Sequence, residues 1–356
     1  MFLVETKVGA IICMLLALLF LGTWPAFLTL LERRGRLPQH TYLDYSLINL
    51  LTAVVIALTV GQIGDAKPNM PNFFTQLSQI QDNWPCVLMA MLGGIFLGLG
   101  NLSTQYAFAL VGLSVTEVIT SSIAVVLGTT LNYFLDDKIN RAEILFPGVG
   151  CFLVAVCLGS VVHSSNAADK AEKLETLANR FEGGIGNVIQ SDYKEVDSCK
   201  DELNDLENGS DRGDKAKVGS AQYLMEVEDK RAIKVFGKSI LLGLIVTFFA
   251  GISYSLFSPA FNLATNDQLH MMKRGVQKLT VYTAFFHFSL SFFLVAVILN
   301  IWFLYRPLLN LPKSSIKSYL NDWNGRNWAF LAGLCCGLGN GLQFMGGQAA
   351  GYAAAD

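Results

Sequence analysis

Eight long apolar stretches dominate this chain of 356 residues. Each is close to the ~20 residues that an α-helix needs to cross a hydrocarbon layer about 30 Å thick. Backbone polar groups in lipid must pair within their own segment, so the expected structure is an all-α polytopic membrane protein. The predicted transmembrane helices are 8–31, 42–60, 84–109, 115–135, 145–162, 240–261, 281–304 and 328–347.

The composition excludes several other classes of protein. Hydrophobic residues make up 52% of the chain and charged residues 15%, whereas soluble domains carry about a quarter charged residues. The formal net charge of -2 gives no polycationic surface for nucleic acid. The seven cysteines are not spaced as metal ligands or as a disulfide framework, so we expect no metal site.

A polar segment separates the fifth and sixth predicted helices. It is rich in Lys, Glu, Asp, Ser, Asn and Gly, and it cannot bury enough apolar surface to fold alone. We expect a largely disordered linker at 164–235 between a first transmembrane region, 1–163, and a second, 236–356. Lys and Arg near the helix ends favour a cytosolic linker. The sequon Asn208-Gly209-Ser210 would be glycosylated only if the linker were luminal.

The two transmembrane regions repeat one another. Gly98-Leu-Gly-Asn101 matches Gly337-Leu-Gly-Asn340, and Pro25-Ala-Phe matches Pro259-Ala-Phe. The first of these alignments also places Gly112 over Gly351 and Glu117 over Asp356. Five helices per repeat force the two halves into opposite orientations, which predicts a 5+5 inverted repeat. About eight of the expected ten helices are then present, and about 50 residues of the second repeat are expected to be missing.

Polar side chains within the predicted helices are the candidates for contact with a substrate. Amides both donate and accept hydrogen bonds, which suits a neutral heterocycle that carries carbonyl and N–H groups. The alternative is that these groups bond neighbouring helices together. Trp24 could stack on a planar substrate or anchor the helix at the membrane interface. The candidates are Trp24, Asn101, Thr104, Gln105, Glu117, Asn340, Gln343 and Gln348.

Two acids are candidates for coupling transport to protons. Glu117 lies among Thr and Ser residues at the start of the fourth predicted helix, and Asp356 is its repeat counterpart. A carboxyl group inside a membrane protein is costly unless it is paired, wetted or protonated, so it is a functional candidate. The alternative is that Glu117 lies at the membrane interface. The repeated Gly-Leu-Gly-Asn either permits a tight helix crossing or loosens the helix at mid-membrane.

A stretch at the end of the linker fits a relaxed Walker-A pattern, with Ala in place of the first Gly. A true phosphate loop follows a strand and precedes a helix packed on a sheet, and neither context is evident here. Basic residues that flank a transmembrane helix on the cytosolic side explain its lysines more simply. The stretch consists of Ala232, Ile233, Lys234, Val235, Phe236, Gly237, Lys238 and Ser239.

Five segments resemble the plant ureide permeases: 17–26, 32–45, 113–120, 257–267 and 339–352. The resemblance implies ten helices in a drug/metabolite-transporter-like arrangement. It also implies proton-coupled import of allantoin, uracil and related breakdown products of purines and pyrimidines. The plasma membrane is the implied location, with the endoplasmic reticulum as the alternative. Ala232 to Ser239 stands where the family has a Walker-A-like stretch, and the family's last two helices have no counterpart in this chain.

The favoured hypothesis is therefore a secondary active transporter of ureides, not an enzyme, that uses protons and needs no other cofactor. One alternative is a truncated, non-transporting homologue or regulatory subunit. Another is a membrane ATPase that uses Lys238 and its neighbours to bind ATP. The expected partners are a small oxo-heterocycle and the lipid bilayer. The preferred substrate and the oligomeric state stay open.

Overall fold

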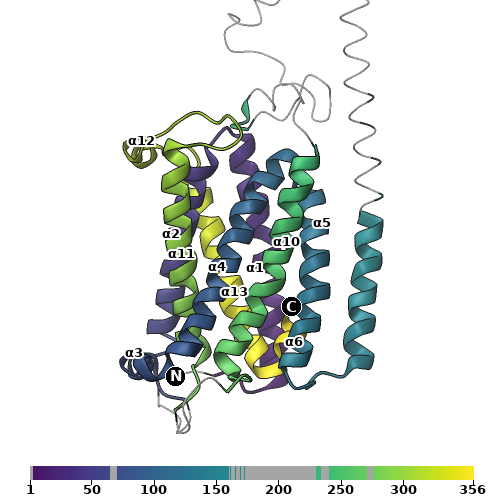
Figure 1. Cartoon of the computed structure of the whole chain (residues 1–356), viewed down its shortest axis with the longest axis vertical. Helices are drawn as coiled ribbons and strands as arrows, with labels where there is room; N and C mark the ends of the chain where they lie inside the picture. The colour runs from purple at the N-terminus through teal and green to yellow at the C-terminus, as the bar shows by residue number, and fades with distance from the viewer. Residues whose placement is uncertain are drawn as a thin grey trace, which may run out of the picture. The chain divides into compact units, whose positions relative to one another are not determined.

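The structure is a computed structural model that describes residues 3–64, 70–159, 161, 165, 169, 172, 230–233, 240–270 and 276–356. Among these residues, eight helices are long and apolar enough to cross a membrane, which confirms the predicted all-helical membrane fold (Figure 1). The helices discussed below belong to one compact unit, Met1–Gly159 with Arg231–Asp356. Most of the predicted linker, including its sequon, and most of the Walker-A-like stretch lie outside the described residues, so the expected disorder stays a prediction.

The observed helix boundaries lie within a few residues of those predicted. Helix α2 begins at Pro38 rather than at residue 42, because proline is well suited to the first turn of a helix. The spanning helices are α1 (Lys7–Arg33), α2 (Pro38–Leu58), α4 (Ile80–Leu110), Leu113–Leu135, Ala142–Gly159, α10 (Ile240–Asn266), α11 (Val281–Tyr305) and α13 (Arg326–Ala350). Within Leu113–Leu135, a π-helical turn (Ala124–Gly128) separates α5 (Leu113–Ile123) from α6 (Thr129–Leu135). Shorter helices are α3 (Phe73–Ser78), α12 (Ile316–Asn321) and α14 (Tyr352–Ala355).

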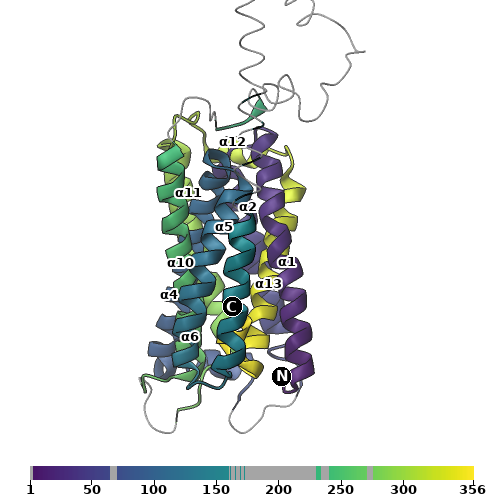
Figure 2. The same ribbon diagram turned by 90° about the vertical axis from the view of Figure 1, so that its right-hand side faces the viewer.

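The helices of the two halves pack against each other in matching pairs. The most extensive contacts join α1 to α13 and α10 to α4, as Figures 1 and 2 show. Helix α2 also packs on α13, α11 packs on α4, and α2 contacts α11. In the repeat alignment α1, α2 and α4 correspond to α10, α11 and α13, so each of these contacts has its counterpart. The inverted repeat itself stays a prediction, with which this pairing agrees.

Close contacts at one end of the bundle fix the directions of the helices. The Arg231 guanidinium donates to Glu32 near the end of α1 (2.9 Å) and to the Ala109 carbonyl near the end of α4 (2.7 Å). Helix α10 begins nine residues later and packs its Gly243 against Leu110 and Val111. Helices α1 and α10 therefore run in opposite directions. We call this end of the bundle, uppermost in Figure 1, the linker end and the opposite one the far end.

Glycines permit the close crossing of α4 and α13 with their neighbours. A Cβ atom at Gly94 would overlap the Phe288 carbonyl oxygen of α11, and one at Gly333 would overlap the Tyr45 carbonyl oxygen of α2. The two glycines are repeat counterparts. Both helices stay α-helical through Gly-Leu-Gly-Asn. Of the two alternatives from the sequence, the structure therefore has the tight helix crossing and not the loosened helix. Small residues let the backbones approach closely where there is no water to drive association.

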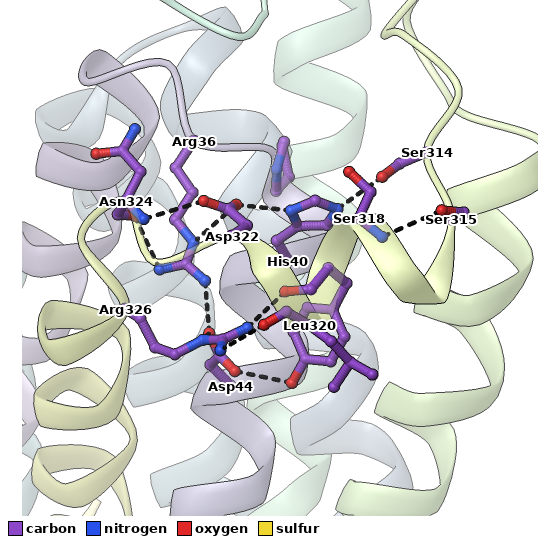
Figure 3. Close-up of polar contacts among 12 residues, drawn as sticks. Arg36, His40, Asp44, Ser314, Ser315, Ser318, Leu320, Asp322, Asn324 and Arg326 are labelled. Carbon is purple, nitrogen blue, oxygen red and sulfur yellow. Dashed lines mark hydrogen bonds and ion pairs between the residues drawn. The ribbon is translucent and has the colours of Figure 1, made fainter.

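A buried ion cluster of Arg36, His40, Asp44, Asp322 and Arg326 joins the two halves at the linker end (Figure 3). Asp44 accepts hydrogen bonds from Arg36 (2.5 Å) and from Arg326 (3.0 Å), and each of these three residues is at most 7% exposed. The ring of His40 lies 2.7 Å from Asp322 Oδ2. Removing one partner from such a buried pair leaves an uncompensated charge, so each member depends on the others.

The pKa of Asp322 predicts how acid affects this cluster. Partial burial opposes ionisation of Asp322, but the hydrogen bond with His40 and the charge of Arg36 outweigh it, so its pKa lies below the usual range. A carboxyl group whose pKa is lowered by folding stabilises the fold above its unfolded-state pKa, about 3.9, and loses that contribution as the pH falls through its folded-state value. We therefore expect the thermal midpoint in detergent to fall between pH 6 and pH 3, and to fall less in Asp322→Asn. Equal slopes for both proteins would contradict this assignment.

Candidate functional site

A cavity of about 540 Å³ lies between α1, α4, α5, the π-helical turn, α10, α13 and α14. Its walls are largely apolar, with Leu21, Leu97 and Phe257 among them. Trp24 lines it and is 7% exposed, so of the two predicted roles its position fits stacking on a ligand rather than anchoring at the interface. A concave, mostly apolar space with a few polar groups is the usual form of a small-molecule site.

Repeat counterparts from both halves line this cavity. Asn101 and Asn340 both line it, as do Glu117 and Asp356. Leu97 and Cys336, which the same alignment pairs, line it as well. Residues that are more than 200 positions apart in the chain therefore form one site, and each half contributes an amide and a carboxylate to it.

Asn101 is completely buried and its amide is fully engaged. Its Nδ2 donates to the Tyr45 hydroxyl of α2 (2.6 Å), and its Oδ1 accepts from the Tyr254 hydroxyl of α10 (2.7 Å). Thr104, another candidate, lies outside the cavity lining and shares the Tyr254 hydroxyl (3.0 Å). These contacts give Asn101 and Thr104 a role in fixing the wall of the cavity. Contact of Asn101, which lines the cavity, with a substrate stays a prediction.

Gln343 has an unused acceptor beside the cavity. Its Nε2 donates to the Ala355 carbonyl (3.2 Å), while its buried Oε1 has no hydrogen-bond partner among the described residues. A buried acceptor without a partner costs free energy unless something donates to it. Asn340, three residues earlier in α13, donates to the carbonyl (2.9 Å) and sulfur (3.1 Å) of Cys336. Gln343 is thus well placed to accept from an N–H group in the cavity.

Two of the predicted contact residues lie elsewhere. Gln105 is 2% exposed, is not part of the cavity lining, and donates to the Pro38 carbonyl at the start of α2 (3.0 Å). Gln348 is half-buried near the end of α13 and is also absent from the lining. The position of Gln105 fits the alternative of an amide that bonds two helices together.

Both predicted acids lie at the cavity, each just after a broken helix. Gly112 (φ +88°) separates α4 from α5, and Gly351 (φ +95°) separates α13 from α14. Only glycine adopts such backbone angles without strain. Gly112 and Gly351, which the repeat alignment pairs, therefore allow the same kind of turn in both halves. Glu117 follows the first turn and Asp356 the second, each by five residues, and both line the cavity. Glu117 therefore lines the cavity about one helical turn from the start of α5, a position that agrees with the predicted functional role.

Several cavity residues escaped the sequence prediction. Tyr254, Phe257, Thr120, Ser121 and Cys336 all line the cavity. Tyr254 could have been found only by knowing that α10 packs on α4. The π-helical turn, which contributes Ala124, Val125 and Gly128 to the lining, has no signature in the sequence. Such turns occur often at functional sites.

The described part of the Walker-A-like stretch consists of Ala232 and Ile233. Neither lies in a strand, and the side chain of Ile233 is completely buried in the hydrophobic core at the linker end. Lys234 to Ser239 lie outside the described residues.

Removing the Tyr254 hydroxyl tests the buried network around Asn101. Tyr254→Phe leaves the Asn101 acceptor without its partner, so we expect a loss of about 1–3 kcal/mol in stability. The thermal midpoint in detergent measures it. Tyr305→Phe is the matched control, because Tyr305 is 51% exposed at the end of α11. Equal midpoints for the two variants would show that the Tyr254 hydrogen bond adds nothing.

Comparison with known proteins identifies the relatives of this fold. The family model described as "Ureide permease" matches residues 41–356. Over the whole chain the sequence is 67% identical to Ureide permease 1 and to Ureide permease 2 of Arabidopsis thaliana, covering 86% and 87% of those proteins. It is 64% identical to Probable ureide permease A3 of Vigna unguiculata, over 98% of this chain and 91% of that protein. No solved structure matches the chain.

Proposed function

Because the chain belongs to the ureide permease family, we propose that it carries allantoin and related oxo-heterocycles, such as uracil and purine breakdown products, across a membrane in symport with protons. The membership makes the chain a multi-pass membrane transporter of ureides rather than an enzyme. The finer parts of the proposal are the range of substrates and the coupling ion. They rest on the cavity.

One observation carries the proposal: the cavity is built from repeat counterparts of both halves, with an amide and a carboxylate from each. A site at the interface of two inverted repeats can open to either side of the membrane as one half rocks against the other. The matched packing of α1 on α13 and α10 on α4 supports this arrangement.

The polar groups of the cavity suit a ureide. A planar ring that carries carbonyl and N–H groups can donate to the free Oε1 of Gln343 while it packs against Trp24 and Phe257. Thr120 and Ser121 bring hydroxyl groups, which donate and accept, to the cavity lining. No basic side chain lines this cavity among the described residues, so it suits a neutral substrate better than an anion.

Glu117 is the leading proton carrier. Its carboxylate has no hydrogen-bond partner among the described residues, and it faces the cavity near Tyr254. A half-buried carboxyl group without a fixed partner binds a proton when the cavity is open to an acidic compartment and releases it on the other side. When the transporter must bind both the substrate and a proton before it transports, the rate of uptake depends on external pH.

Glu117→Gln tests this assignment, because glutamine keeps the size of the side chain and cannot be ionised. In yeast that lacks its own permeases, we expect wild-type uptake of labelled allantoin and uracil to be faster at pH 5 than at pH 7. The variant should show the same slow uptake at both pH values. Exposed Glu143 provides the control, Glu143→Gln. If the Glu117 variant kept the pH dependence of the wild type, Glu117 would not be the carrier.

We place the protein in the plasma membrane with the linker end in the cytosol. Arg33, Arg34, Arg231 and Arg326 lie at that end of the helices, and positively charged loops favour the cytosolic side. An import cycle then starts with the far end open to the outside.

In the proposed cycle a proton gradient drives transport, so no step requires a nucleotide. We therefore expect Lys238→Ala, within the Walker-A-like stretch, to leave allantoin uptake unchanged apart from any change in expression. Uptake normalised to the amount of surface protein measures this. A loss of uptake together with loss of ATP binding would favour the ATPase hypothesis instead.

A further inference from the structure

The two acids of the cavity are held in different ways. Whereas Glu117 has no fixed partner among the described residues, the Asp356 carboxylate accepts a hydrogen bond from the Asn132 amide of α6. The same Asn132 amide nitrogen donates to the Ser258 hydroxyl of α10 (2.8 Å). Asp356 is therefore tied to two helices and Glu117 to none.

The contacts of Asn132 lead from the cavity to a third carboxylate. Asn132 Oδ1 accepts from the Asn262 amide (2.9 Å), and that amide nitrogen also donates to Asp136 Oδ1 (2.9 Å). The other oxygen of Asp136 accepts from the backbone N–H of Ala353 in α14 (2.9 Å). Because α14 also carries Asp356 at its end, the hydrogen bonds form a closed ring through α6, α10 and α14.

The ring is buried, and it contains a charge without a countercharge. Asn132 and Asn262 are completely buried, and Asp136 is 4% exposed. No Lys, Arg or His of the described residues forms an ion pair with Asp136. A buried carboxylate is expensive, and here only amide and backbone donors compensate it. Apolar residues would hold three helices together at lower cost, which indicates that the charge does something besides packing.

We propose that Asp136, acting through Asn262 and Asn132, is a positioning residue that holds Asp356 in the cavity wall and sets the pH at which Asp356 binds a proton. This inference rests on the proposed proton-coupled function. Asp356 then works beside Glu117 as a second, fixed acid, while Glu117 is free to exchange partners.

The backbone around Gly351 supports the positioning role. A Cβ atom at Gly351 would lie 3.3 Å from Asp136 Oδ2 and 2.6 Å from the Asn140 amide nitrogen, so only glycine lets α14 approach this closely. Asp136 binds the backbone of α14 at Ala353, and Asn132 binds the side chain of Asp356, which follows this helix.

The ionisable groups that face Asp356 are few. Across the cavity lie Glu117 of α5, Tyr254 of α10 and Cys336 of α13, and α1 contributes none. Tyr352 of α14 points its hydroxyl at Thr265 (2.9 Å). Directly after α6 the ionisable group is Asp136, connected through the two amides, whereas Tyr133 of α6 packs its ring on Phe134 and Phe146. A neighbouring negative charge favours the protonated form of a carboxyl group, so Asp136 helps Asp356 to keep its proton.

The test compares Asp136→Asn with Asp137→Asn, measured as allantoin uptake from pH 4.5 to pH 7.5. Both variants remove one negative charge from adjacent positions. Asp137 is exposed and has φ +52°, an angle that asparagine tolerates, so it is the matched control. For Asp136→Asn we expect the pH of half-maximal uptake to move to lower pH by on the order of 0.5 unit or more. For Asp137→Asn we expect no shift.

A second variant distinguishes a change in proton binding from a general loss of folded protein. Asn262→Ser removes the amide that connects Asp136 with Asn132 and keeps Asp136 itself, so we expect a shift in the same direction as in Asp136→Asn. If both variants lower the rate of uptake but keep the wild-type pH profile, the ring is only structural and the proposal is overturned. If wild-type uptake itself does not depend on pH, the proposed proton coupling fails and the proposal fails with it.

Discussion

Polar groups buried between these helices must find partners, because neither lipid nor a dry helix interface offers water. At several places the structure meets this constraint by joining the two halves of the chain. Asn101 bonds to tyrosines of α2 and α10, and Asp44 bonds to arginines from both halves. Several buried polar atoms have no partner among the described residues, and of these only Gln343 Oε1 belongs to a residue that lines the cavity. The Glu117 carboxylate, which has no hydrogen-bond partner among the described residues, also lies in that lining.

Different polar networks join the two halves at the two ends of the bundle. At the linker end, arginines and carboxylates form a buried ion cluster that seals the ends of α1, α2 and α13 (Figure 3). At the far end, Asp136 and two asparagines form a ring without a cation. Alternating access requires that one closure weaken while the other forms. A cavity between two such networks, each joining both halves, is consistent with that cycle.

The sequence predicts the architecture well and the site in part. Hydrophobic length identifies all eight spanning helices, and the repeated Gly-Leu-Gly-Asn leads to both cavity asparagines and to both acids. Gln105 is misleading, because an amide that bonds helices together and an amide that binds substrate have the same sequence signature. Tyr254 and Asn132 could not be predicted, since their roles depend on which helix packs against which. Local patterns do not carry that information.

The most direct test is whether a ureide occupies the cavity shared by the two halves. Ser121→Cys places a thiol in the cavity wall, and native Cys157, exposed on the helix Ala142–Gly159, is an internal reference. The measurement is the rate at which a small thiol reagent modifies each cysteine in the purified protein, followed by peptide mass spectrometry. Saturating allantoin should slow modification at position 121 and leave Cys157 unaffected. Equal rates with and without allantoin, in protein that still transports it, would contradict the account.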